Sequence, residues 1–253
     1  MIRFANKEDV SNIKELWNIA FPEEPDFNEY FFENIFDFKN TIVKIKDNKV
    51  VSMAQMMPYE LKNIGKVTYI YGAATNPQYR KQGLMSQLLK KSFEIDVKNN
   101  VKASILIPAN KPLYDFYGNL GYETCFYANK YTHKSTGKIA VIEECSEVKK
   151  LSQIYTGDVT RSGEYWNIQL NMYKALGGKI LCYNNAYAVV SDKVEELMYL
   201  NTSDKEILLN SICEFLKVDT IEVTEIGGNT PVGMIKKHCK FKCGNMYMGL
   251  MFN

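Results

Sequence analysis

The sequence predicts a mixed α/β (α+β) fold, because helical and extended apolar patterns alternate along the chain. In some segments apolar residues recur at the spacing of one helix face, whereas other short segments are rich in valine, isoleucine and tyrosine, as strands are. The same order of elements is predicted in both halves, which favours two units. With 253 residues, 46% of them apolar, the chain is long enough for one large core or two modest ones.

Residues 69–86, YIYGAATNPQYRKQGLMS, place a positively charged turn between a strand and a helix. Residues 69–71 favour an extended backbone, and Pro77 ends the strand because proline donates no ladder hydrogen bond. The predicted helix carries an apolar residue at every fourth position: Met85, Leu89, Phe93 and Val97. The first amides of a helix lack intrahelical partners and lie at the positive end of the helix dipole. The turn therefore predicts a binding site for an anionic diphosphate.

The turn also carries a family signature. Gly83 lets the backbone approach a ligand closely, and Arg80 and Lys81 add positive charge beside it. The register TNPQYRKQGLM resembles the acetyl-CoA signature of the GCN5-related N-acetyltransferases (GNAT), Arg/Gln-x-x-Gly-x-Gly/Ala. Met85 replaces the usual small residue, and its flexible side chain can turn into the core. This variant resembles the bacterial tandem-domain acetyltransferases related to the enhanced-intracellular-survival proteins.

The resemblance implies that acetyl-CoA binds here as the acyl donor. The strand that ends at Thr75 would pair with the pantetheine arm, and one of its amides would polarise the thioester carbonyl. Residues 80–86 would hold the diphosphate. The implied cofactor-binding residues are Ala73, Ala74, Thr75, Arg80, Lys81, Gln82, Gly83, Leu84, Met85, Ser86 and Asn110.

A second motif follows a predicted strand at residues 103–107. Asn110, Tyr117 and Gly121-Tyr122 reproduce the family spacing Asn-x6-Tyr-x3-Gly-aromatic. By resemblance, Asn110 positions the cofactor near its thiol end and Tyr117 is the catalytic acid that protonates the departing thiolate. A phenol, with a reference pKa of about 10, keeps its proton at neutral pH, and a thiol near 8.5 leaves well once it receives one. The alternative is that Tyr117 is a core aromatic.

The first residues, MIRFANKEDVSNIKELW, make a third match. They predict a short strand, an Asn6 cap with Asp9 three residues later, and a helix with one apolar side. The residues of that side are Val10, Ile13, Leu16 and Trp17. Together the three motifs indicate one acetyl-CoA-binding GNAT domain over residues 1–135.

From residue 138 the pattern starts afresh. Helices are predicted at 151–155 and 166–176, strands at 179–182, 186–191 and 197–200, a helix capped by Ser203-Asp204 with Phe215 on its apolar side, and a strand at 220–223. The repeated order indicates a second, degenerate GNAT-like domain over residues 138–253. Its equivalent turn carries Asp204 and Glu206 instead of basic residues, so we expect no acetyl-CoA there. We expect this second domain to complete the core, to cover the first domain and to form a wall of the acceptor pocket. The alternative is a separate peptide-binding or regulatory domain.

The function implied is transfer of an acetyl group to a primary amine by direct attack, without an enzyme nucleophile. The general base is unassigned, because the strand before the turn has no carboxylate. Glu60, a water chain and the terminal carboxylate of Asn253 are candidates. Glu23, Glu24 and Asp26 occupy the loop expected to border the acceptor, where they would attract a cationic amine; a solvated loop is the alternative. A non-catalytic acetyl-CoA sensor or a protein-interaction module is the competing function.

The composition of the chain limits the classes of partner that we expect for this protein. A net charge of +2 gives no reason to expect nucleic-acid binding. The chain has no run of 18 apolar residues and no signal or transit sequence, so we expect a cytoplasmic protein with no membrane partner. Six scattered cysteines fit reduced thiols, and their spacing predicts no metal site. A small-molecule or peptide amine is the expected acceptor, and the sequence is compatible with an oligomer.

Overall fold

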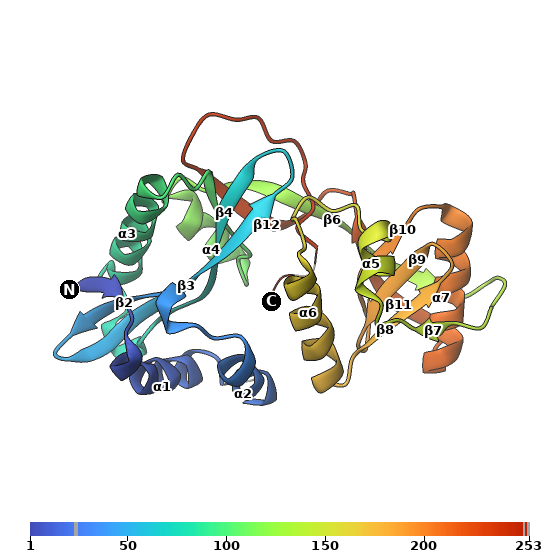
Figure 1. Ribbon diagram of the computed structural model, residues 1–253, viewed down its shortest axis with the longest axis horizontal. Coiled ribbons are helices and arrows are strands. Elements are labelled where there is room, and N and C mark those ends of the chain that lie inside the picture. Colours follow the sequence, from blue (N-terminus) through green and yellow to red (C-terminus); the bar gives the residue numbers. More distant parts are fainter. Residues whose placement is uncertain (23–24, 250, 252–253) are drawn as a thin grey trace. The chain divides into compact units, whose positions relative to one another are not determined.

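The computed structural model describes residues 1–22, 25–249 and 251, and their contacts divide the chain into two compact units (Figure 1). Unit 1 contains Met1–Cys125 and Gly233–Cys243, and unit 2 contains Phe126–Val232 and Gly244–Met251. Two strands cross between the units. Strand β6 (Glu123–Lys134) passes into unit 2 at residue 126, and β12 (Thr230–Lys237) passes into unit 1 at residue 233. How the functions divide between residues 1–135 and 138–253 stays a prediction.

Unit 1 is built on a mixed sheet in the order β1-β2-β3-β4-β5-β12. Its other strands are β1 (Ile2–Phe4), β2 (Thr41–Lys46), β3 (Lys49–Leu61), β4 (Gly65–Thr75) and β5 (Ala103–Leu106). Neighbouring strands are antiparallel except β4 and β5, which are parallel. A parallel pair needs a crossover, and α3 (Leu84–Lys98) provides it.

Helices cover both faces of this sheet. Because alternate strand residues point to opposite faces, Ile42 packs with α3 and α4 (Lys111–Gly118), whereas Val43 packs with α1 (Val10–Ala20) and α2 (Pro25–Asn34). Figure 1 shows α1 and α3 on opposite sides of β2 and β3. Short 3-10 helices at Lys7–Asp9, Phe38–Asn40 and Pro77–Tyr79 complete the unit. The expected Asn6 cap is confirmed, and Asp9 completes a capping box, because the two residues exchange side-chain to backbone hydrogen bonds.

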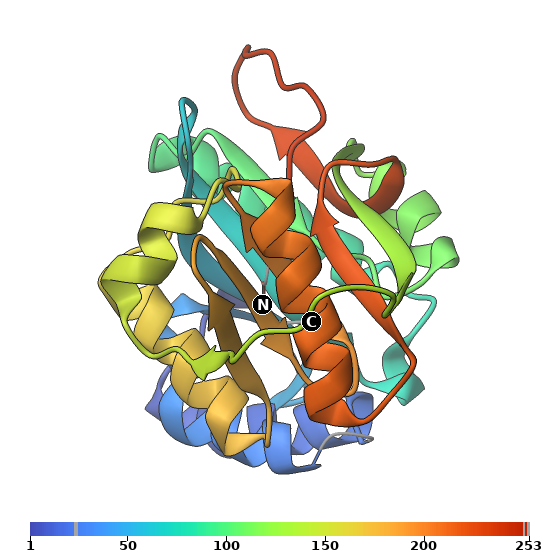
Figure 2. The same cartoon turned by 90° about the vertical axis from the view of Figure 1, so that its right-hand side faces the viewer.

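Unit 2 repeats this arrangement in the order β7-β8-β9-β10-β11-β6. Its strands are β7 (Glu143–Glu144), β8 (Lys179–Tyr183), β9 (Ala186–Val190), β10 (Val194–Tyr199) and β11 (Thr220–Ile226), and again only the fourth and fifth, β10 and β11, are parallel. Helices α5 (Val148–Ile154) and α6 (Gly163–Ala175) pack in one core, and α7 (Thr202–Leu216) packs in the other. In Figure 2, α7 (orange) lies across the strands of unit 2. The mixed α/β fold and a second unit with the same order of elements are therefore confirmed.

Two helices differ from the expected pattern. On α3 the buried residues are Leu84, Leu88, Leu89, Ser92 and Asp96, and Val97 is 57% exposed. Each step of four residues advances about 400°, so a series spaced by four drifts off the buried face.

The cap of α7 is Asn201 rather than Ser203-Asp204, and Phe215 is 48% exposed. The buried Asp96 is compensated by hydrogen bonds to Thr68 and His238.

Candidate functional site

Strands β4 and β5 part where the cofactor is expected. They pair only at Val67–Tyr69 with residues 103–105. Strand β4 then continues to Thr75, and no further residue of it pairs with β5 in the described part of the chain. The predicted pantetheine contacts Ala73, Ala74 and Thr75 all lie in this continuation. Backbone groups on the parted side of β4 are thus placed to pair with an extended ligand.

A bulge at Gly72 accompanies this parting. Met53 of β3 faces Ala74 and Gln55 faces Tyr71, so β4 has one extra residue in between. Gly72 has φ +56°, and a Cβ there would lie 2.2 Å from the ring of Trp17. Glycine is therefore required both by the backbone conformation and by the tryptophan packed against it. Trp17 itself is fixed, because its Nε1 donates to Asn28 Oδ1 at 2.7 Å.

The predicted diphosphate site lies at the start of α3. Gly83 is the N-cap residue with φ +69°, and no side chain caps the helix there. Lys81 also has a positive φ, of +61°, and such left-handed residues turn successive amides toward one concave side, as in anion-binding nests. The first turn of α3 contains no acidic residue, and a Cβ on Gly83 would meet nothing within 4 Å. The first amides of α3 therefore have no capping side chain in the described part of the chain, and the space beside Gly83 is open.

The other residues of the turn are exposed or anchor it. Arg80, Lys81 and Gln82 are exposed, and Arg80 Nε donates to the carbonyl oxygen of Thr75 at 3.1 Å. This bond ties the turn to the end of β4. Met85 is half-buried and packs against the core beneath α3, as the sequence predicts for its flexible side chain.

The equivalent helix start in unit 2 is occupied by the chain itself. Asn201 Oδ1 accepts from the amide of Asp204 at 2.8 Å, and Asp204 accepts from Asn201 and Asn185. Burial opposes ionisation of Asp204, but hydrogen bonds from Asn201, Asn184 and Asn185 outweigh it and hold its pKa below the ordinary value. The carboxylate of Asp204 therefore occupies, at the start of α7, the position that corresponds to the predicted phosphate site at the start of α3.

Two lysines that sequence reasoning missed lie beside α3. Lys44 and Lys46 come from β2, and their Nζ atoms lie 2.9 Å from Gln87 Oε1 and 3.4 Å from Gln82 Oε1. Lys46 Nζ also lies 5.2 Å from the centre of the Tyr79 ring. In the sequence, only their spacing of two residues along a strand indicated that both lysines lie on the same face of β2, the face toward α3. Their nearness to the turn depends on tertiary packing.

Tyr117 lies on α4 in the core beneath the parted strands. It shares this core with Ile70 and Leu106, which follow the last paired residues of β4 and β5. Its side chain is 7% exposed, and burial raises its pKa to about 12. Its hydroxyl has no hydrogen-bond partner among the described residues. Tyr117 is thus buried in the core, and its phenol keeps its proton at neutral pH.

Asn110 has a structural task. It is the N-cap of α4, and its Oδ1 accepts from the amide of Leu113 at 3.3 Å. Its side chain is exposed. Contact of Asn110 with a cofactor stays a prediction.

The acceptor side is described only in part. Asp26 lies exposed in the first turn of α2, whereas Glu23, Glu24 and Asn253 lie outside the described residues. Glu60 is exposed on β3 opposite Lys66 and brings no carboxylate into β4.

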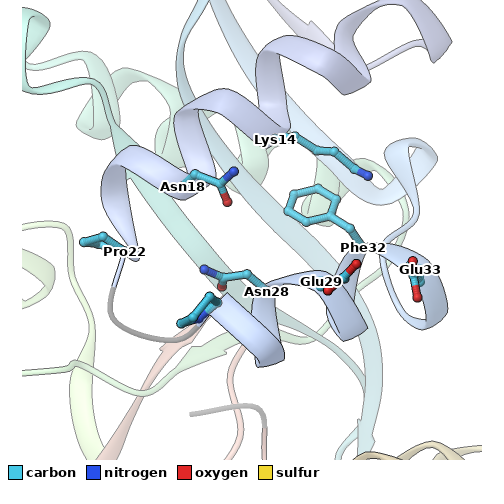
Figure 3. Close-up of a pocket in the computed structure, with 8 residues that line it drawn as sticks. Lys14, Asn18, Pro22, Asn28, Glu29, Phe32 and Glu33 are labelled. Atoms are coloured by element: carbon cyan, nitrogen blue, oxygen red, sulfur yellow. The ribbon is translucent and has the colours of Figure 1, made fainter.

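A cavity of about 480 Å³ lies between α1 and α2 (Figure 3). Glu29 and Glu33 line it from one turn to the next of α2, and Lys14 lies across from them with its Nζ 5.2 Å from the centre of the Phe32 ring. Asn28 also lines it, but both ends of its amide are engaged, with Trp17 and the carbonyl oxygen of Phe21. The remaining lining residues are Asn18, Pro22 and Pro25. Sequence reasoning did not single out Glu29 or Glu33.

The described part of the chain holds no cluster of three or more His, Cys, Asp or Glu side chains suited to a metal. None of the six cysteines forms a disulfide. No described helix combines the length and apolarity needed to span a membrane.

Residues 1–125 match a family model described as an acetyltransferase (GNAT) domain. Among solved structures, a probable N-acyltransferase from Enterococcus faecalis is 19% identical with a TM-score of 0.74, covering 94% of this chain and 72% of that one. Eis1 from Mycobacterium abscessus is 13% identical with a TM-score of 0.70, covering 94% and 73%. A putative acetyltransferase from Pyrococcus horikoshii is 15% identical with a TM-score of 0.67, covering 99% and 94%. At these identities the likeness concerns the fold. No curated protein matches the chain.

Proposed function

Through residues 1–125 this chain belongs to the GNAT superfamily, and we propose that unit 1 transfers an acetyl group from acetyl-CoA to a primary amine. The observation that carries the proposal is the parting of β4 from β5 beside the uncapped start of α3. A thioester ligand whose extended arm leads to a diphosphate matches these two features in order: the arm would lie along the parted strand and the diphosphate at the helix start. Its amide-containing arm needs backbone partners, and its phosphates need amides and positive charge.

In this proposal Ala73, Ala74 and Thr75 pair with the pantetheine arm, and one of their amides polarises the thioester carbonyl. Residues 80–86 hold the diphosphate through the first amides of α3 and through Arg80 and Lys81. The amine nitrogen attacks the carbonyl carbon directly, a carbon–nitrogen bond forms, and the carbon–sulfur bond breaks. The proton lost by the amine passes to solvent or to a base not yet assigned.

Tyr117 is proposed to protonate the departing thiolate. Its buried phenol, with a pKa of about 12, holds its proton at neutral pH, and its hydroxyl is not engaged by another described residue. A buried phenolate is costly, so the proton has to be restored before the next cycle. This role is supported by the packing of Tyr117 in one core cluster with Ile70 and Leu106, the residues that follow the last paired positions of β4 and β5.

Calorimetric titration with acetyl-CoA tests the binding part of the proposal. Arg80→Glu with Lys81→Glu reverses two exposed charges at the start of α3 and should abolish binding without unfolding the protein. Lys240→Glu with Lys242→Glu is the matched control, because these residues are also exposed in unit 1 and follow β12, which pairs with β5. Equal acetyl-CoA affinity in the two double variants would show that the turn is not the diphosphate site.

Release of free CoA in the presence of polyamines, aminoglycosides, amino acids and peptide N-termini tests turnover. The proposal expects CoA release that depends on one class of amine. Tight acetyl-CoA binding without turnover on any amine would favour the acetyl-CoA sensor.

A further inference from the structure

The start of α3 is surrounded by more positive charge than a diphosphate requires. Arg80 and Lys81 lie in the turn, and from β2 Lys44 reaches Gln87 in the first turn of α3 while Lys46 reaches Gln82 in the turn before it. In the described part of the chain, none of these four cations forms an ion pair with a carboxylate.

Other lysines of unit 1 behave differently. Lys91 pairs with Glu94 at 2.7 Å, and Lys237 pairs with Glu123 at 2.6 Å. Lys44 and Lys46 instead donate to neutral amide oxygens. A phosphate carries the opposite charge that these amide oxygens lack, so it would displace Gln82 and Gln87 from the ammonium groups.

The proposed donor carries a second phosphate site. Coenzyme A has, besides its diphosphate, a monoester on the 3′-oxygen of its ribose, which bears about −1.5 to −2 charge at pH 7. The amides of α3 with Arg80 and Lys81 account for the diphosphate, whereas the lysines of β2 are held nearby by Gln87 and Gln82. Flexible lysine side chains suit a compact, rotating monoester better than a bidentate fork would.

We propose that Lys44 and Lys46 bind the 3′-phosphate of coenzyme A and make unit 1 select phosphorylated coenzyme A over its 3′-dephosphorylated form. This inference rests on the proposed function, since it assigns a third phosphate to the same ligand. It adds β2 to the binding site and gives the nucleotide end of the donor a specificity determinant.

The test compares calorimetric affinities for coenzyme A and 3′-dephospho-coenzyme A. The parent protein should prefer coenzyme A by about 10-fold or more, as expected for two exposed charge pairs of ordinary strength. In Lys44→Gln with Lys46→Gln, affinity for coenzyme A should fall by about 10-fold while affinity for the dephosphorylated form stays within about twofold. Lys240→Gln with Lys242→Gln removes the same net charge elsewhere in unit 1 and should keep the parent preference.

The outcomes separate the two proposals. Equal affinity of the parent for both ligands, or an unchanged preference in the Lys44 and Lys46 variant, overturns the 3′-phosphate assignment and leaves the diphosphate site in place. Loss of preference in the Lys240 and Lys242 control as well would reduce the effect to net charge and also overturn it. If the parent binds neither ligand, the proposed function fails and this inference fails with it.

Discussion

Substitution of two glycines by alanine should affect stability and acetyl-CoA binding to different extents. Gly72 in β4 and Gly83 at the start of α3 both have positive φ, so alanine at either position strains the backbone by about 1–2 kcal/mol. Only at Gly72 does the new methyl group meet an obstacle, the ring of Trp17 at 2.2 Å. That ring is 1% exposed and held by Asn28, so it has little room to move. Overpacking of this kind costs about 1–3 kcal/mol more.

We therefore expect Gly72→Ala to lower the free energy of unfolding of unit 1 by about 2–5 kcal/mol, and Gly83→Ala by about 1–2 kcal/mol. Acetyl-CoA affinity should respond in the opposite order among variants that remain folded. A methyl group on Gly83 points into open space where the diphosphate is proposed to lie, so binding should weaken markedly there despite the smaller loss of stability.

Urea unfolding followed by tryptophan fluorescence measures the first effect, and calorimetry measures the second. The chain has two tryptophans, and Trp166→Phe in both variants leaves Trp17 as the reporter for unit 1. If Gly72→Ala is no less stable than Gly83→Ala, the steric role of Trp17 against the bulge is refuted. If Gly83→Ala binds acetyl-CoA as the parent does, close approach of the ligand to this glycine is refuted.

Three further predictions concern single groups. Tyr117→Phe should lower turnover by about 10²–10⁴ and change stability by less than about 1.5 kcal/mol, because its hydroxyl has no described hydrogen-bond partner; normal turnover, measured as CoA release, would assign the proton to another group. Asp204→Ala with Glu206→Ala should leave calorimetric stoichiometry at one acetyl-CoA per chain, and two bound molecules would contradict the degenerate character of unit 2. The Arg3 guanidinium bonded to Asp9 holds the pKa of that carboxyl below its ordinary value of 3.8. The ion pair therefore adds its full stability above pH 3.8, and this stability is lost as the pH falls through the lower pKa of Asp9 in the folded protein. In acid unfolding curves, Asp9→Asn should remove this pH-dependent part, at most about 1 kcal/mol, and an unchanged curve would show that the pair adds nothing.

Local signals in the sequence predicted much of unit 1. The capping box of Asn6 and Asp9, the proline after β4 and the glycine before α3 each act through their own backbone or a neighbour within a few residues, so the sequence alone reveals them. The repeated order of elements likewise predicted the fold of unit 2. The cap at Asn201 shows the limit of such reasoning, since several adjacent polar residues can each cap a helix and geometry selects one.

Features that depend on distant residues could not be predicted. The approach of Lys46 to Gln82 joins residues on different elements, and the fit of Gly72 against Trp17 exists only once α1 packs on the sheet. The burial of Asp96 depends on His238, which no short-range pattern places beside it. Pairing of β5 with β12 is the largest omission, because a strand pairing carries no local sequence signature beyond its alternation.

The pairing of β5 with β12 constrains when the protein can fold. During synthesis, all the residues of β1 to β5 have been made long before Gly233, yet one edge of β5 stays open until residues 233–237 have been made and pair with residues 103–106. An open strand edge attracts other chains, so the nascent chain is exposed to misassembly while residues 107–232 are being made. A fragment that stops at residue 135 lacks the strand that covers β5. A chain that contains the whole sheet of unit 1 therefore reaches Lys237.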